Sequence, residues 1–161
     1  MAYRIGSGID FHQLAEGREL WIGGIKIPHH KGAVGHSDAD VLLHAICDAM
    51  LGALCLGDIG VHFPDTNAAY KNIDSKILLA KTFELVKEKG YQIVNIDSTL
   101  CLESPKISPH IPSMQNAISG ILSISISDIS IKATTTEKMG FAGREEGLVA
   151  YATVLLKKNK A

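Results

Sequence analysis

This sequence of 161 residues has no excess of charge of either sign and no long apolar run. Its 16 lysines and arginines stand against 17 aspartates and glutamates, so there is no basic field to hold nucleic acid by counterion release. Nowhere do about eighteen apolar residues follow one another, as a membrane-spanning helix requires. The N-terminal MAYRIGSGIDFH also lacks the apolar core of a secretory leader. We therefore expect a cytoplasmic protein with no nucleic-acid or membrane partner.

Cysteine is also scarce. The sequence contains only Cys47, Cys55 and Cys101, and no CxxC spacing. An odd number of cysteines without that spacing argues against both a disulfide framework and a cysteine-zinc knuckle. We expect all three to be small buried hydrophobic residues.

The order of apolar periodicities predicts the fold class. Alternation predicts a strand at 3–12, and Gly23-Gly24 predicts a hairpin within 20–28. Ser37 and Asp40 form a capping-box-like start to a helix at about 38–56. Further helices are predicted from Asp74 or Ser75 to Gly90 and from Pro112 to Leu122, and further strands at 91–103, 128–134 and 147–157. This alternation predicts an α/β (α+β) single-domain sandwich over residues 1–161, with helices packed on one face of a mixed β-sheet.

The first predicted strand and helix carry a candidate metal site. Asp10 and His12 are two residues apart, so both point to the face opposite Ile9 and Phe11. His44, in the middle of the predicted helix, can approach them from a neighbouring element. Two imidazoles and one carboxylate suit zinc and leave a fourth position open for water or substrate. The alternative is a hydrogen-bonded polar pair at the end of a strand.

Two acidic residues flank the histidine of the predicted helix. Asp40 and Asp48 lie four residues before and after His44, so one of them could accept its second ring N–H and fix its tautomer. A solvated acidic helix face explains the same spacing.

The segment DISIKATTTEKMGFAGREEG is rich in groups that bind phosphate. Thr134, Thr135 and Thr136 offer hydroxyl donors, Glu137 is a hard oxygen ligand suited to Mg²⁺, and Arg144 can clamp a phosphate. The loops at 57–67 and 103–112 mix proline with charge, as binding loops often do. Ordinary turns between strands are the alternative, because Ser, Thr, Gly and Pro are common there.

Five strings occur in order: GSGIDFH, HSDADVLLHAICDAMLGALCLGDIG, FPDTN, SPKISPHIP and KATTTEKMGFAGREEG. From about Ile5 to Leu156, the chain closely resembles the 2-C-methyl-D-erythritol 2,4-cyclodiphosphate synthase family. The resemblance implies an enzyme of the non-mevalonate isoprenoid route. Such an enzyme converts 4-diphosphocytidyl-2-C-methyl-D-erythritol 2-phosphate to the cyclic diphosphate and CMP.

The resemblance also implies ligands and roles. Zn²⁺ would be held by Asp10, His12 and His44, and Mg²⁺ or Mn²⁺ by Glu137, while His36 and Thr135 would stabilise the transition state. On the metal side, the implied substrate contacts are Asp10, His12, His36, Ser37, Asp58, Ile59, Gly60, Phe63, Pro64, Asp65, Thr66 and Asn67. On the cytidine and diphosphate side, they are Leu102, Glu103, Ser104, Pro105, Lys106, Ile107, Ser108, Thr134, Thr135, Thr136, Glu137, Phe141 and Arg144.

Members of this family are homotrimers with active sites between subunits, so the resemblance implies a homotrimer here. The sequence departs from the family pattern at Ser7, Ala39, Asn67, Met139 and Ala142. Only Asn67 falls on a matched binding position. A metal-dependent phosphohydrolase and a binding module with a structural metal remain as competing interpretations.

Overall fold

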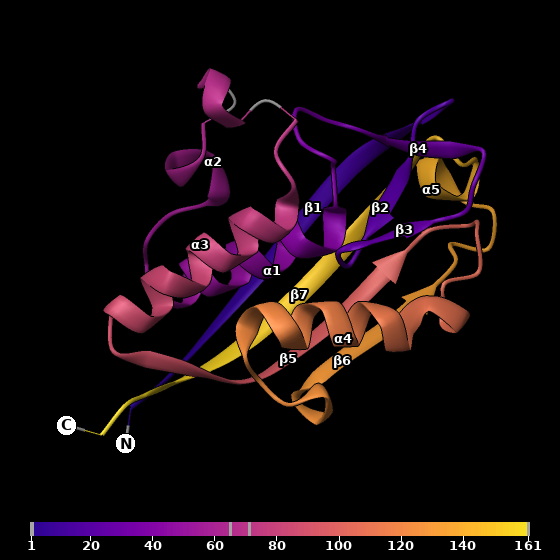
Figure 1. The fold of residues 1–161 in the computed structure, drawn as a ribbon. Coiled ribbons are helices and arrows are strands. Elements are labelled where there is room, and N and C mark those ends of the chain that lie inside the picture. Colours follow the sequence, from indigo (N-terminus) through magenta and orange to yellow (C-terminus); the bar gives the residue numbers. More distant parts are fainter. Residues whose placement is uncertain (1, 65, 71, 161) are drawn as a thin grey trace.

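A computed structural model describes residues 2–64, 66–70 and 72–160 and contains a mixed five-stranded sheet. Its strand order is β4-β1-β7-β5-β6, and every neighbouring pair is antiparallel except β5 and β6 (Figure 1). A separate hairpin, β2-β3, turns at the predicted Gly23-Gly24. The strands are β1 Tyr3–Glu16, β2 Leu20–Ile22, β3 Ile25–Ile27, β4 Lys31–Val34, β5 Tyr91–Cys101, β6 Ile129–Thr134 and β7 Gly147–Lys158.

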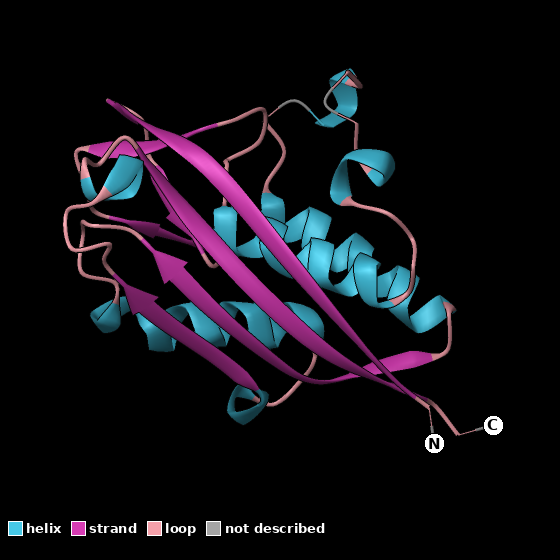
Figure 2. Ribbon diagram, turned by 180° about the vertical axis from the view of Figure 1, so that it is seen from behind, coloured by secondary structure: helices cyan, strands magenta, loops and turns pink. Residues whose placement is uncertain are grey.

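The long helices lie on one face of this sheet, as predicted (Figure 1). Figure 2 shows the opposite face, over which no helix of the described residues passes. No described helix is both long enough and apolar enough to cross a bilayer. The helices are α1 Val41–Ala53, α2 Ile59–His62, α3 Ser75–Glu88, α4 Ile111–Leu122 and α5 Gly140–Gly143, with 3-10 turns at Ala68–Tyr70, Ser108–His110 and Ile126–Asp128.

Helix α1 packs directly on the backbone of β1. A Cβ atom added to Gly6 would lie 2.0 Å from the carbonyl oxygen of Ala49, and one added to Gly8 would lie 2.1 Å from that of Ala45. These distances leave no room for any side chain, so only glycine permits the helix to come this close. The contact sets the height of α1 above the strand, and therefore the position of every side chain that α1 directs towards β1.

The start of α1 differs from the prediction. The helix begins at Val41, and the N-cap is Asp40, whose carboxylate accepts a hydrogen bond from Leu43 N. The same carboxylate accepts from the backbone N–H groups of Gly23 and Gly24, at 2.9 and 2.7 Å. Asp40 is fully buried, and burial raises the pKa of its carboxyl group despite these three hydrogen bonds. One side chain thus joins the β2-β3 turn to the helix that carries His44.

The bare face of the sheet is unusually apolar for a surface. Ile5, Ile9 and Phe11 on β1 and Tyr151 on β7 are 70%, 44%, 52% and 50% exposed. Ile9 pairs with Tyr151 across the two strands, and Ile5 and Phe11 share a face of β1 with Ile9, so all four side chains lie on the same face of the sheet. Exposed apolar side chains gathered on one face are typical of an interaction surface.

The prediction that all three cysteines are buried is confirmed for Cys47, only partly met by Cys101 and wrong for Cys55. Cys47 is buried in α1 and Cys101 is partly buried at the end of β5, but Cys55 is exposed. Cys55 follows the last turn of α1 in a left-handed conformation with φ of 56°, which turns its side chain away from the core. There its Sγ lies 3.7 Å from a guanidinium nitrogen of Arg4.

We predict that Gly8→Ala destabilises the protein by about 3 kcal/mol, because a new methyl group would meet helix backbone rather than a side chain that can move. Gly120→Ala is the matched control: it lies in α4, where an added Cβ meets nothing within 4 Å. Alanine there should stabilise the protein by about 0.5–1 kcal/mol through helix propensity. Urea unfolding of both variants measures the difference. Equal stabilities would show that α1 can shift freely on β1.

We predict that Asp40→Ala also costs about 3 kcal/mol, because three buried backbone N–H groups lose their acceptor. Asp74→Ala provides the comparison, since Asp74 caps α3 by accepting from Lys76 N in a more exposed setting. Loss of that cap should cost about 1 kcal/mol. Thermal unfolding of the two variants measures the difference. An equal decrease of the two unfolding midpoints would contradict the role given to Asp40.

Candidate active site

Asp10, His12 and His44 converge on one point between β1 and α1. His12 Nε2 and His44 Nδ1 each lie 3.0 Å from Asp10 Oδ2, and the two nitrogens are 3.2 Å apart. A tetrahedral zinc with ligand bonds of about 2.0–2.1 Å would set its ligand atoms about 3.3 Å apart. The predicted ligand set is therefore brought together in a triangle of the size that one such ion requires.

The second nitrogen of each imidazole is held by the protein. His12 Nδ1 lies 3.0 Å from the backbone oxygen of Val34, which can only accept, so Nδ1 carries the proton. His44 Nε2 lies 2.8 Å from Ser75 Oγ and 3.3 Å from Ser37 Oγ. Each ring is thus fixed at its far nitrogen and turns the near nitrogen into the triangle, as metal-ligating histidines do.

The hypothesis that Asp40 or Asp48 orients His44 is wrong. Asp40 is occupied by the cap and turn described above, and Asp48 Oδ1 accepts from the backbone N–H of Ile59 at 2.7 Å. Ser75 takes the expected role, and its hydroxyl in turn donates to Asp38 Oδ1. Sequence reasoning identified Ser75 only as a possible helix cap, because its contact with His44 joins residues 31 positions apart.

The electrostatics of the triangle favour a cation at its centre. Burial raises the pKa of Asp10, but the interactions of its carboxylate with His12 and His44 outweigh this effect, so the pKa lies well below its ordinary value. Burial lowers the pKa of His12, but its interactions with Asp10 raise the pKa by a larger amount. The net shift is therefore upward. A carboxylate that stays ionised, beside imidazoles oriented towards it, provides the charge and the lone pairs that a divalent ion needs.

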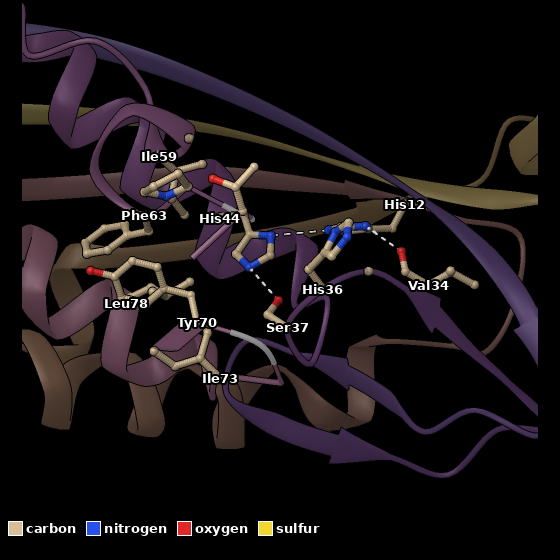
Figure 3. Close-up of a pocket in the computed structure, with 14 residues that line it drawn as sticks. His12, Val34, His36, Ser37, His44, Ile59, Phe63, Tyr70, Ile73 and Leu78 are labelled. Carbon is tan, nitrogen blue, oxygen red and sulfur yellow. Dashed lines mark hydrogen bonds between the residues drawn. The ribbon is translucent and has the colours of Figure 1, made fainter. Parts of the chain in front are cut away.

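A pocket of about 810 Å³ opens beside the triangle. Figure 3 shows His12, His36, Ser37 and His44 around one end, and Ile59, Phe63, Tyr70 and Leu78 around the other. Polar groups therefore gather at the metal end and apolar groups at the far end. Most of the predicted metal-side contacts line this pocket, namely His12, His36, Ser37, Ile59, Gly60, Phe63, Pro64 and Thr66, together with Val34, Gly35, Tyr70, Ile73 and Leu78, which were not predicted.

Three other predicted metal-side residues have different places. Asp58 is the N-cap of α2 and accepts from Val61 N at 3.1 Å, so it shapes the pocket wall through the helix. Asn67 is exposed at the start of the 3-10 turn Ala68–Tyr70 and donates its backbone N–H to the Pro64 oxygen. Asp65 lies outside the described residues.

Most of the predicted cytidine-side residues, but not Ser104, Thr136, Glu137, Phe141 or Arg144, line a second, smaller pocket of about 230 Å³. It lies between the loop after β5 and the end of β6, and the Ser104-Pro105 peptide bond in that loop is cis. It shares no lining residue with the 810 Å³ pocket. Its lining comprises Leu102, Glu103, Pro105, Lys106, Ile107, Ser108, Ala133, Thr134 and Thr135.

The remaining predicted residues follow β6. Glu137 Oε1 accepts from Thr135 Oγ1 at 3.2 Å, and Glu137 is exposed with a left-handed φ of 52°. Phe141 packs against Phe11, with ring centroids 6.0 Å apart. The Arg144 guanidinium donates two hydrogen bonds of 3.0 Å to the carboxylate of Glu146. These contacts do not direct it towards the small pocket.

One departure from the family pattern, Ala39, has a structural cost. Ala39 stands where glycine is common, and it adopts a left-handed φ of 56° while fully buried. Glycine takes this conformation without the steric cost of a Cβ atom. Ala39 therefore carries strain in the short segment between Ser37 and Asp40.

The fold and the ligand triangle define an α/β domain with a candidate divalent-metal site at the mouth of a pocket. A family model described as the YgbB family matches residues 3–157. A 2-C-methyl-D-erythritol 2,4-cyclodiphosphate synthase of Bacteroides thetaiotaomicron is 63% identical over 159 residues, which are 99% of this chain and 100% of that protein. The chain belongs to the YgbB family, and the resemblance found in its sequence is confirmed.

Solved structures agree with this assignment. A bifunctional IspDF from Campylobacter jejuni has a TM-score of 0.94 and 41% identity; the match covers 98% of this chain and 42% of that one. A CDP complex of IspF from Plasmodium falciparum has a TM-score of 0.87 and 35% identity, over 99% of this chain and 98% of that one. The predicted α/β class with a mixed sheet is thereby confirmed.

Proposed function

We propose that this protein is a 2-C-methyl-D-erythritol 2,4-cyclodiphosphate synthase, which acts in isoprenoid precursor biosynthesis. The substrate would be 4-diphosphocytidyl-2-C-methyl-D-erythritol 2-phosphate, and the products the cyclic diphosphate and CMP. The observation that carries the proposal is the triangle of Asp10, His12 and His44 at the mouth of a large pocket. A relative with that activity matches the chain along its whole length, and a structural neighbour binds CDP.

The residues present fit a metal-dependent reaction. Asp10, His12 and His44 would hold Zn²⁺, and Glu137, a hard oxygen ligand, would hold Mg²⁺ or Mn²⁺ together with the diphosphate. When bound, these ions would supply Lewis-acid neutralisation of the diphosphate charge.

The chain's own residues would position the reacting groups. The substrate's 2-phosphate would attack the β-phosphorus, a new P–O bond would form, and the bond to the α-phosphate would break to release CMP. The nucleophile is already an anion, so no general base is required and positioning dominates. His36 and Ser37 face the large pocket, and Thr134 and Thr135 line the small one. The Thr135 hydroxyl, which donates to Glu137 Oε1 here, would turn to donate to a phosphoryl oxygen of the bound substrate.

A homotrimer would unite the two pockets into one site. The two pockets share no lining residue, so a single substrate that spans metal and nucleotide sites needs them brought together. The apolar patch of Ile5, Ile9, Phe11 and Tyr151 supplies a surface that association would bury. We therefore include in the proposal active sites shared between neighbouring subunits.

The deciding experiment is ³¹P NMR of the purified protein with 4-diphosphocytidyl-2-C-methyl-D-erythritol 2-phosphate, Mg²⁺ and Zn²⁺. We expect CMP and a cyclic diphosphate, with both signals abolished by a chelator. An acyclic product would show that the protein is a hydrolase. An unchanged substrate spectrum from folded, metal-loaded protein would show that it only binds its ligand.

We predict that metal ligands and transition-state donors are separable. His44→Ala should lose bound zinc and turnover together, because it removes one corner of the triangle. Thr135→Ala should keep zinc and lower kcat roughly ten- to a thousandfold, as loss of one oriented donor does. Zinc content by atomic absorption, measured beside kcat, tests both expectations. Normal zinc in His44→Ala would refute the ligand assignment.

We predict that Ile9→Glu disrupts the assembly, because it places charge in the apolar patch on β1. Ile77→Glu is the matched control, since Ile77 on α3 is equally exposed, at 46% against 44%, but lies on the helical side. Light scattering should give a smaller species for Ile9→Glu alone. A trimer that survives Ile9→Glu unchanged would exclude this face as the interface.

A further inference from the structure

His44, Ser75 and Asp38 form a short chain of hydrogen bonds behind the metal triangle. His44 Nε2 lies 2.8 Å from Ser75 Oγ, and the Ser75 hydroxyl donates to Asp38 Oδ1. Ser75 is 0% exposed, so water does not compete for its hydroxyl group. Neither Ser75 nor Asp38 is among the residues that the family resemblance implies for the site.

Counting protons along this chain fixes the direction of each bond. A serine hydroxyl has one proton, and a carboxylate has none to donate. Since the Ser75 proton goes to Asp38, the oxygen of Ser75 can only accept from His44, and the proton of that imidazole must sit on Nε2. In a neutral His44 the other nitrogen, Nδ1, then carries no proton, and it faces Asp10 Oδ2 at 3.0 Å across the position that a cation would occupy.

Asp38 also fixes where the serine stands. Its Oδ2 accepts from the backbone N–H of Ser75 at 3.1 Å, so one carboxylate binds both the amide and the hydroxyl of the same residue. Ser75 is the first residue of α3, where the N–H has no acceptor within the helix. The position of the Ser75 oxygen is therefore set by two bonds to Asp38, besides its bond to His44.

We propose that Ser75, oriented by Asp38, is a positioning residue that holds His44 in the Nε2–H tautomer and so keeps Nδ1 available to a divalent metal ion. This inference rests on the proposed metal site. Without the Ser75 oxygen, Nε2 keeps only the longer 3.3 Å contact with Ser37 Oγ among the hydrogen bonds described, so His44 is less restrained from rotating or from carrying its proton on Nδ1. In that tautomer it cannot bind the metal through the corner of the triangle. Outer partners of this kind change metal affinity by about 10–100-fold.

The first test is Zn²⁺ affinity of the full chain, measured by competition with a chelator in the absence of substrate. Ser75→Ala should bind Zn²⁺ about 10–100-fold more weakly than the wild type. Ser98→Ala is the matched control, because Ser98 is also buried and its hydroxyl makes one hydrogen bond, to the Ser130 oxygen at 2.9 Å in the sheet. It should bind Zn²⁺ as the wild type does.

The second test reads the tautomer itself, which a purely structural role would not change. The ¹⁵N chemical shifts of the His44 ring in metal-free protein distinguish protonated from bare nitrogens. The wild type should show the proton on Nε2, and Ser75→Ala should show an increased share on Nδ1.

Asp38→Ala should act in the same direction, because the Ser75 hydroxyl loses the carboxylate oxygen to which it donates. The hydroxyl is then free to donate to another acceptor. The hydroxyl proton would then turn towards His44 Nε2 and favour the Nδ1–H tautomer. This variant keeps the test decisive if Ser75→Ala fails to fold.

The outcomes separate this inference from the proposed function. If the wild type binds no Zn²⁺, the proposed metal site fails. If the wild type binds Zn²⁺ and the folded Ser75 and Asp38 variants bind it equally well with an unchanged His44 tautomer, the positioning role is overturned while the site stands. Weaker binding by these variants, with normal binding by Ser98→Ala and a shifted tautomer, supports it.

Discussion

The contact between α1 and β1 is the constraint on which the rest of this structure depends. Gly6 and Gly8 bring the backbone of the helix against the backbone of the strand, with no side chain between them. His44 immediately precedes Ala45, whose carbonyl oxygen faces Gly8. The depth of this packing therefore decides how far His44 stands from Asp10. The geometry of the Asp10-His12-His44 triangle therefore depends on Gly6 and Gly8.

Buried and partly buried aspartates then tie the surrounding loops to α1. Asp38 holds the first turn of α3, Asp40 holds the β2-β3 turn, and Asp48 holds α2 through Ile59 N. Each carboxylate accepts backbone N–H groups that would otherwise lie unsatisfied at helix ends and turns. Such bonds are expensive to break, because the groups that they satisfy are shielded from water. These hydrogen bonds fix the segments around the large pocket relative to α1.

The two pockets lie at different places on the sheet. Its helical side carries the triangle and the large pocket, and the segments that follow β5 and β6 carry the small pocket. Its bare side leaves Ile5, Ile9, Phe11 and Tyr151 in solvent, in place of a second layer of helices. A chain of this length covers one face of its sheet itself. In the proposed assembly, another copy of the chain covers the other face.

The sequence by itself determined the long helices, most of the strands and the α/β class, because these depend on spacing within single strands and helices. The grouping of His44 with Asp10 and His12 was predicted with the help of the family resemblance. Asp10 and His12 share a face of β1 through the two-residue repeat of a strand. The tertiary structure alone decided which side chain meets which across the chain. It gave the second bond of His44 to Ser75, 31 residues away, rather than to Asp40 or Asp48 on its own helix. Local spacing brings those aspartates near His44, but Asp40 bonds to the β2-β3 turn and Asp48 to α2, and neither partner can be read from a periodicity.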